Sequence, residues 1–368
     1  MLIDSIKQLY KIGPYSIGEN HPPIFLAEIG TFFNQDLGVA EQLLHKIITI
    51  RDKVPYQPLI LKTEILNNSN ICLPVDYEET YASKSGEIRK ENYRSLIERK
   101  TLSLEHYSIL FSLLKNANLP FIVSIYELDT IDFAIKQGAC ALKTSSSNIV
   151  HVPLIRHLAK TGLPLIIDTG RSSLTDICKA VETAKSAGCE KIIIEHSPDG
   201  HPALPEAHNL RMLRTLNQCF SLPVGLSDHY NGIEMLYMSI ALGASILEKG
   251  VHLYPEDIDQ DISHTMGIDQ LAKTLETIYN CWQALGQPMR DLEAPIKGVL
   301  GSSQRTCLVA KQELHPGTLI SLENTTFAFP CKGVPTQYWD LVNGWELQNK
   351  VSIGEPIKWS DIKQKNDC

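Results

Sequence analysis

Eight short apolar runs, each followed by a longer segment with helical spacing, constrain this fold more than any other feature of the sequence. Their apolarity is continuous rather than alternating, as expected for strands that are buried on both faces of a parallel sheet. Eight such units favour a closed (β/α)8 TIM barrel in the α/β class, and a doubly wound open sheet is the main rival. The runs are 24–29, 58–62, 121–126, 140–143, 164–169, 191–196, 223–228 and 245–250.

The pattern changes after the last helical segment, which indicates a second domain. We assign residues 1–290 to the barrel and residues 291–303 to a linker, because Gly, Pro and Ser interrupt that stretch. Residues 304–368 hold short strand-like pieces such as CLVAKQ and TTFAF, separated by turn residues. This pattern predicts a small β-rich domain.

Composition and charge argue against several classes of protein. The formal net charge is −8 and the chain has no basic run, so we expect no nucleic-acid partner. No apolar run approaches the roughly 20 residues of a membrane helix, and the first residues lack a signal-peptide core. The nine cysteines stand singly, without a CxxC pair, which favours reduced thiols. We therefore expect a cytoplasmic protein with no membrane partner.

Polar side chains follow the predicted strands at the ends where a barrel carries its active site. Lys62 and Lys143, the latter followed by three serines, indicate a site for phosphate or carboxylate, although each lysine could instead be solvated or ion-paired. Glu28 is a candidate general base, or a partner of one of these lysines. His229 is a candidate metal ligand or proton carrier, or a histidine that is hydrogen-bonded to backbone.

The order of several motifs carries a family resemblance. Over roughly residues 15–360 the chain resembles the sialic acid (N-acetylneuraminate) synthases, and CLVAKQELHPGTLISLEN resembles their antifreeze-like, or SAF, domain. The run LIIDTG with VGLSDH at this spacing is the most specific part. The motifs are AEIG (27–30), SIYELDTIDFA (124–134), LKTSSSNI (142–149), LIIDTG (165–170), VGLSDH (224–229), ILEKG (246–250) and DQDISHTM (259–266).

The resemblance implies an activity and a set of site residues. The family joins phosphoenolpyruvate to the aldehyde of N-acetylmannosamine or a related sugar, and a divalent manganese or magnesium ion polarises the aldehyde oxygen. It also implies a homodimer in which the SAF domain of one subunit caps the barrel of the other. By position, Glu28 and His229 are implied to be catalytic, and Asn148 and Asp261 to bind the sugar. The residues implied to hold phosphoenolpyruvate are Lys62, Ser124, Lys143, Ser146 and Ser227.

This chain departs from the family pattern at several site positions. Gly250 stands where the family has its second metal-binding histidine. His252 lies two residues further on, hence on the same face of a strand, and is the candidate replacement. If His252 enters the barrel mouth, a two-histidine site is rebuilt with His229; otherwise we expect His229 to bind a metal only weakly. Other departures are Glu64, Asp168, Asn148, Asp199, His201 and Phe329.

The leading hypothesis is an enzyme that condenses phosphoenolpyruvate with an amino-sugar aldehyde to give a nonulosonic acid and phosphate. The rival hypothesis is a catalytically silent relative that binds a sugar or phosphate, or that pairs with an active synthase. A third is another phosphoenolpyruvate-dependent barrel aldolase. Metal content and phosphate release separate the first from the second, and product mass separates the first from the third.

Overall fold

The structure is a computed structural model that describes residues 10–18, 20–33, 35–255, 259–289 and 305–364. The linker predicted at 291–303 lies outside the described residues. Contacts divide the chain into two compact units, Met1–Gln287 and Pro288–Cys368, and each is described by itself.

Eight parallel strands of the first unit close into a barrel. Each strand pairs with the next along the chain, and β12 closes the ring by pairing with both β11 and β3. Every strand overlaps one of the eight apolar runs, which confirms the predicted TIM barrel over the open sheet. The strands are β3 (Ile24–Gly30), β4 (Leu59–Ile65), β7 (Phe121–Ile125), β8 (Ala141–Thr144), β9 (Leu165–Asp168), β10 (Ile192–His196), β11 (Val224–Ser227) and β12 (Ala244–His252).

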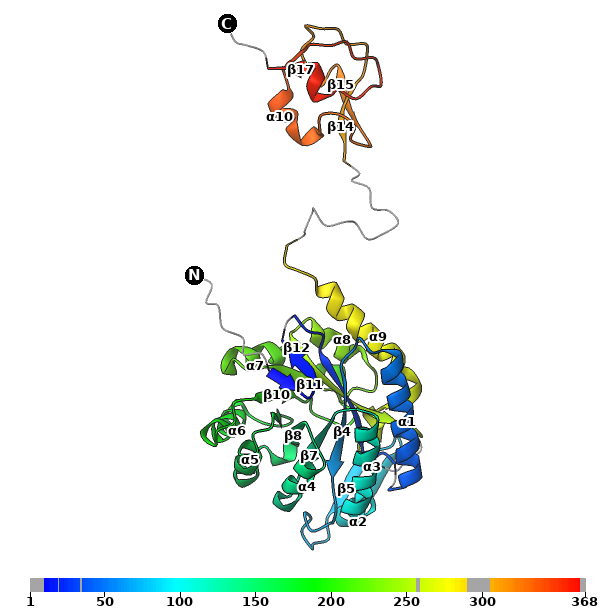
Figure 1. Cartoon of the computed structure of the whole chain (residues 1–368), viewed down its shortest axis with the longest axis vertical. Coiled ribbons are helices and arrows are strands. Elements are labelled where there is room, and N and C mark those ends of the chain that lie inside the picture. The colour runs from blue at the N-terminus through cyan, green and yellow to red at the C-terminus, as the bar shows by residue number, and fades with distance from the viewer. Residues whose placement is uncertain (1–9, 19, 34, 256–258, 290–304, 365–368) are drawn as a thin grey trace. The chain divides into compact units, whose positions relative to one another are not determined.

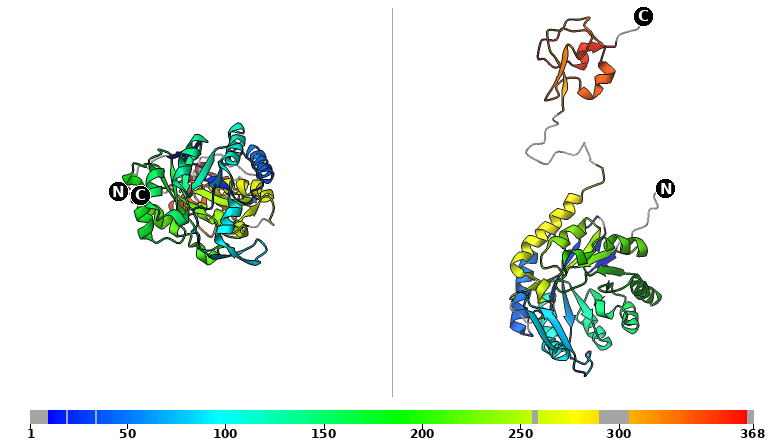
Figure 2. Two further views of the ribbon diagram at one scale, coloured as in Figure 1. Left: turned by 90° about the horizontal axis from the view of Figure 1, so that it is seen from below. Right: turned by 180° about the vertical axis from the view of Figure 1, so that it is seen from behind.

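Helices follow the strands and cover the outside of the barrel (Figure 1). Asp36 caps the first of them and Ser173 the helix after β9, each accepting hydrogen bonds from backbone N–H groups of the first turn. The first and last helices contact each other and lie side by side in the right-hand view of Figure 2. The helices are α1 (Leu37–Lys53), α3 (Leu104–Asn116), α4 (Ile131–Lys136), α5 (Val152–Ala159), α6 (Leu174–Ser186), α7 (Met212–Phe220), α8 (Glu234–Ile240) and α9 (Ile268–Leu285).

A hairpin before the first barrel strand fills the amino-terminal end of the barrel. Its strands are β1 (Tyr10–Ile12) and β2 (Tyr15–Ile17). Ile12 and Ile17 are buried in a cluster with the inward-facing residues of the early strand positions, such as Ile24. A small apolar cluster thus closes this end of the barrel, apart from the larger core between strands and helices, and the polar site lies at the other end.

An insertion between β4 and α3 was not predicted from the sequence. It contains the hairpin β5 (Glu78–Ala82) and β6 (Ile88–Asn92), followed by α2 (Tyr93–Lys100). Lys84 at the hairpin tip donates to the carbonyl of Thr265 at 2.6 Å. The insertion therefore contacts the loop that follows β12.

The second unit is a small β-rich fold, as the strand-like pieces predicted. Its elements are β14 (Cys307–Ala310), β15 (Thr325–Ala328), α10 (Trp339–Val342), β16 (Glu346–Leu347) and β17 (Ile362–Lys363). The strands β14 and β15 pair antiparallel, as do β16 and β17. Leu308, Val334 and Ile357 are fully buried in its core.

Two expectations about the whole chain concern the cysteines and the membrane. The eight cysteines among the described residues are free thiols. In the part of the chain that the structure describes, no helix combines the length and the apolarity needed to cross a bilayer.

Candidate active site

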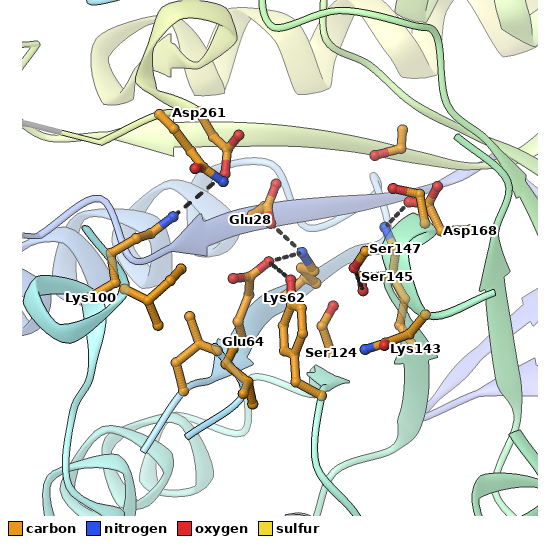
Figure 3. Close-up of a pocket in the computed structure, with 18 of the residues that line it drawn as sticks. Glu28, Lys62, Glu64, Lys100, Ser124, Lys143, Ser145, Ser147, Asp168 and Asp261 are labelled. Atoms are coloured by element: carbon orange, nitrogen blue, oxygen red, sulfur yellow. Dashed lines mark hydrogen bonds and ion pairs between the residues drawn. The ribbon is translucent and has the colours of Figure 1, made fainter. Parts of the chain in front are cut away.

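A cavity of about 830 Å³ opens at the carboxyl ends of the barrel strands. Polar side chains from seven of the eight strands line it, and the close-up in Figure 3 shows the lysines among carboxylates. All of the residues predicted for the site line this cavity except His252. Those that line it are Glu28, Lys62, Ser124, Lys143, Ser146, Asn148, Ser227, His229 and Asp261.

Lys143 on β8 lies at the centre of a buried cluster of charges. Its ammonium group is 2.5 Å from Glu195 Oε2, 2.7 Å from Glu248 Oε1 and 3.1 Å from Asp168 Oδ2. Burial disfavours the charge, but the three carboxylates, Glu195 foremost, outweigh it and hold the pKa of Lys143 well above its usual range. The Lys143 side chain is therefore a fixed positive charge that contacts three carboxyl groups.

Lys62 on β4 shares one of these partners. Its Nζ contacts Glu28, lies 3.7 Å from Glu64 Oε1 and lies 3.5 Å from the same Glu248 Oε1 that contacts Lys143. The two predicted anion-binding lysines therefore meet at one oxygen. Each lysine is also ion-paired with carboxyl groups of the protein, which was the alternative to anion binding. Both interpretations therefore apply to these lysines.

The carboxyl groups around the lysines divide into two kinds. Burial raises the pKa of Glu28 to about 7 and, with the charge of Glu248, the pKa of Glu195 to about 8. Burial also disfavours ionisation of Asp168 and Glu248, but Lys143 outweighs it and lowers the pKa of both. Near neutral pH two of the groups are ionised and two titrate, so the proton content of the site changes with pH.

A second buried ion pair lies at the rim that the insertion forms. Lys100 Nζ is 3.2 Å from Asp259 Oδ2 and 3.6 Å from Asp261 Oδ2, and Thr31 donates to Asp259 at 2.8 Å. Figure 3 shows Lys100 and Asp261 facing each other. Lys100 could not be predicted as a site residue, because it lies at the end of helix α2 of the insertion and not at the end of a barrel strand.

Polar residues next in sequence to those that line the cavity point away from it. Lys249 Nζ contacts Asp228 Oδ2 at 2.8 Å, and His208 Nε2 lies 3.2 Å from Asp228 Oδ1. Successive side chains of a strand alternate between its two faces. Ser227 and Glu248 therefore face the cavity, while Asp228 and Lys249 form a buried pair behind them.

Three histidines meet at one side of the cavity. The ring centroid of His229 lies 4.4 Å from that of His201 and 4.6 Å from that of His264, and the last two rings are 5.2 Å apart. Burial lowers the pKa values of His229 and His264 well below the usual range. His201 appeared in the sequence only as a departure from the family pattern, and His264 had not been singled out.

Of the two alternatives stated for His252, the structure has the one in which it does not enter the barrel mouth with His229, because the two residues line different cavities. The candidate metal ligand His252 is therefore a correction. His252 Nδ1 lies 2.7 Å from Thr265 Oγ1, and His252 lines a separate cavity of about 320 Å³ with Lys84. At Gly250, an ideal Cβ would lie 2.5 Å from Thr265 Cγ2. Neither Gly250, where the resemblance implies the second metal ligand, nor His252, the candidate replacement, is therefore placed to bind a metal together with His229.

Comparisons with known proteins agree with this barrel and its second unit. The profile of the NeuB family matches residues 60–290, and that of the SAF domain matches residues 305–363. The chain is 27% identical over 353 residues to the uncharacterized protein MJ1065 of Methanocaldococcus jannaschii, covering 96% of this chain and 98% of that protein. It is 26% identical to the N,N'-diacetyllegionaminic acid synthase of Legionella pneumophila, covering 94% and 96% of the two chains.

A solved structure shows the same fold. The N-acetylneuraminic acid synthetase of Leptospira borgpetersenii, crystallised with citrate, superimposes with a TM-score of 0.66 at 22% identity, covering 77% of this chain and 92% of that one. The predicted resemblance to sialic acid synthases is confirmed by these matches. Because the family profile covers more than half of the sequence, the chain belongs to the NeuB family, as a divergent member with a C-terminal SAF domain.

Proposed function

We propose that this protein condenses phosphoenolpyruvate with an N-acylated amino-sugar aldehyde to give a nonulosonic acid and phosphate. The observation that carries the proposal is the meeting of Lys62 and Lys143 on Glu248 at the floor of one cavity. Ser124, Ser146 and Ser227 line the same cavity and add hydroxyl donors. The named synthases among the relatives make products of this class.

The proposed reaction assigns a role to each side of the cavity. A bond forms between the methylene carbon of phosphoenolpyruvate and the aldehyde carbon, water adds to the pyruvyl carbon, and the C–O bond to phosphate breaks. Lys62 and Lys143 bind the carboxylate and phosphate groups as fixed charges. Glu28, with a pKa of about 7, can hold or release a proton near neutral pH. Asn148 and Asp261 line the cavity and are assigned to the sugar.

The assembly is also a proposal. We expect a two-fold dimer in which the SAF domain of each subunit covers the barrel mouth of its partner, because a symmetric dimer lets each cap serve its neighbour. Light scattering at micromolar concentration should give the mass of a dimer. The mass of a monomer under these conditions would contradict the proposed dimer.

The test is phosphate release from phosphoenolpyruvate in the presence of aldehydes such as N-acetylmannosamine and other N-acylated amino sugars, with and without manganese. Mass spectrometry should find a product equal to the sum of aldehyde, phosphoenolpyruvate and water, less phosphoric acid. Lys62→Met should abolish release, and exposed Lys273→Met is the matched control. Aldehyde-dependent phosphate release without such a product would point to another reaction.

A second candidate is a silent relative that binds a sugar or phosphate ligand. The observation that favours it is the engagement of Lys143 by three carboxylates, among them Asp168, where the family has a serine. This candidate predicts ligand binding without phosphate release for any aldehyde tested. Calorimetry with phosphoenolpyruvate alone, set beside the release assay, separates the two.

A further inference from the structure

One side of the cavity is lined by large apolar or aromatic side chains, which have no part in the roles proposed above. They come from three segments: the stretch after β4, the helix α2 of the insertion, and the turn that follows β7. Leu66 and Ile97 are buried, whereas Ile71 and Leu128 are 36% and 42% exposed. We call this set the apolar wall, and its members are Leu66, Ile71, Tyr93, Ile97 and Leu128.

Hydrogen bonds hold the three segments of the apolar wall side by side. Ser69, in the stretch after β4, donates to Glu98 Oε1 on α2 at 3.1 Å. Its neighbour Asn68 donates to Glu127 Oε2 at 3.2 Å, and Glu127 immediately precedes Leu128. The polar side chains of these segments thus bond to one another. The apolar wall is therefore one continuous feature, although its parts lie far apart in the sequence.

The two wall residues on α2 show how long a ligand group the apolar wall can hold. Tyr93 and Ile97 are four residues apart in the sequence, so they lie on one face of the helix, about 6 Å apart along its axis at ~1.5 Å per residue. A methyl group covers roughly 4 Å, which is the contact distance between carbon atoms, and does not cover both residues. The apolar wall therefore fits an alkyl chain of several carbons better than the methyl group of an acetyl.

The apolar wall adjoins the residue that the proposed function assigns to the sugar. Lys100 continues the same face of α2, three residues after Ile97, and its Nζ lies 3.6 Å from Asp261 Oδ2. Lys100 and Asp261 both line the cavity and face each other in Figure 3. A sugar bound at Asp261 would therefore have a substituent within reach of the apolar wall.

We propose that the apolar wall binds the N-acyl chain of the acceptor sugar, and that this chain is longer than acetyl. An N-acyl chain joins a polar amide to an alkyl end, which matches the Lys100–Asp261 ion pair at one edge and the apolar side chains beyond it. Ligand pockets commonly combine apolar walls with a few polar groups in this way. The inference rests on the proposed function and names the substrate class, an amino-sugar aldehyde with an acyl chain of about three to five carbons.

The experiment compares N-acetyl-, N-propanoyl-, N-butanoyl- and N-pentanoylmannosamine in the phosphate-release assay with the full chain. We expect kcat/KM to rise about fourfold for each added methylene as far as N-butanoyl, because each one leaves water for the apolar wall. The double variant Ile71→Ala/Leu128→Ala should reduce the ratio of N-butanoyl to N-acetyl kcat/KM by about threefold or more. Ile109→Ala is the control, because Ile109 is a similarly exposed residue of α3 that does not line the cavity.

Binding separates this inference from the proposed function. Calorimetry with the same four sugars needs no turnover, and their affinities should rise in the same order even if no phosphate is released, in which case only the proposed function fails. A flat series, tightest binding of the N-acetyl sugar, or an equal rise in the native chain and the double variant would each overturn the inference.

The other alkyl group that a sugar of this class can carry is tested separately. If removal of the 6-hydroxyl group of N-acetylmannosamine improves binding while longer acyl chains do not, the apolar wall binds another part of the sugar and the inference is wrong. Thermal melting checks that the double variant is folded. The single variant Leu128→Ala, which trims a side chain that is already partly exposed, gives the same test if the double variant is unstable.

Discussion

Thr265 packs against Gly250 so closely that no side chain fits at position 250. An ideal Cβ at Gly250 would lie 2.5 Å from Thr265 Cγ2 and 3.1 Å from a ring carbon of Phe32. Contacts as short as the first do not occur between real atoms, so any side chain at Gly250 must displace the loop that carries Thr265. The family histidine cannot simply be restored at this position.

We therefore predict that Gly250→Ala lowers the free energy of unfolding by about 1–3 kcal/mol through overpacking. Thr265→Ser removes Cγ2 while keeping the hydroxyl that contacts His252 and Ile262, so the double variant should recover part of the loss. Urea denaturation of the two single variants and the double variant measures the coupling. Additive effects would show that Thr265 is not the obstacle.

The titration of Glu195 should appear in the pH dependence of stability. Burial raises the pKa of Glu195 from its ordinary value of 4.5 to about 8 in the folded protein. Between those values the native state binds more protons than the unfolded state, so this residue makes stability fall as pH rises. In Glu195→Gln the fall in melting temperature between pH 5 and pH 8 should be smaller than in the native chain. An identical fall in both would contradict the assignment.

Phosphoenolpyruvate binding should weaken across the same range of pH. As the pH rises through about 7 and then about 8, Glu28 and Glu195 gain negative charges beside the two lysines. These charges repel an anionic ligand, so we expect the affinity to fall about tenfold, or ~1.4 kcal/mol. Calorimetry from pH 6 to pH 9 measures this, and the double variant Glu28→Gln/Glu195→Gln should have a flatter profile. Tighter binding at high pH would be the opposite of the expectation.

The barrel could be read from the sequence because parallel strands buried on both faces give continuous apolar runs. Because a barrel carries its site at the carboxyl ends of its strands, the positions of Lys62 and Lys143 at strand ends also placed them correctly at one mouth. The insertion that carries Lys84 and Lys100 was not predicted, because β5 and β6 are only partly buried and lack such runs.

The arrangement of the histidines could not be predicted in the same way. His252 has the right parity on β12, but Thr265 at 2.7 Å holds its ring in another cavity. His264 lies in a loop turn, where no periodicity fixes the direction of a side chain. A tertiary contact between the end of β12 and the loop that follows it, which the spacing of residues does not show, thus keeps His252 away from His229.

Asp168→Ser should strengthen the binding of phosphoenolpyruvate. The Asp168 carboxylate lies 3.1 Å from Lys143 and accepts from Ser197 at 2.6 Å, and its lowered pKa keeps it ionised. Removing it frees part of the Lys143 charge for an anionic ligand, and we expect at least a tenfold gain in affinity measured by calorimetry. Asp129→Asn, at the exposed rim of the same cavity, is the control. Weaker binding in Asp168→Ser would mean that Asp168 supports the anion site rather than competing with it.

Lys143 should also be one of the most important residues for stability. Lys143→Met leaves Glu195, Glu248 and Asp168 buried without their shared cation, and breaking a buried ion pair in this way costs about 3–5 kcal/mol. The exposed Lys273→Met removes the same group from the surface of α9, where the side chain is 77% exposed, and should change stability by less than about 0.5 kcal/mol. Adding Glu195→Gln to Lys143→Met should recover part of the loss, because one of the stranded carboxylates disappears. Chemical denaturation at pH 8 tests the set, and equal effects of the two lysine substitutions would show that the cluster around Lys143 contributes nothing to the fold.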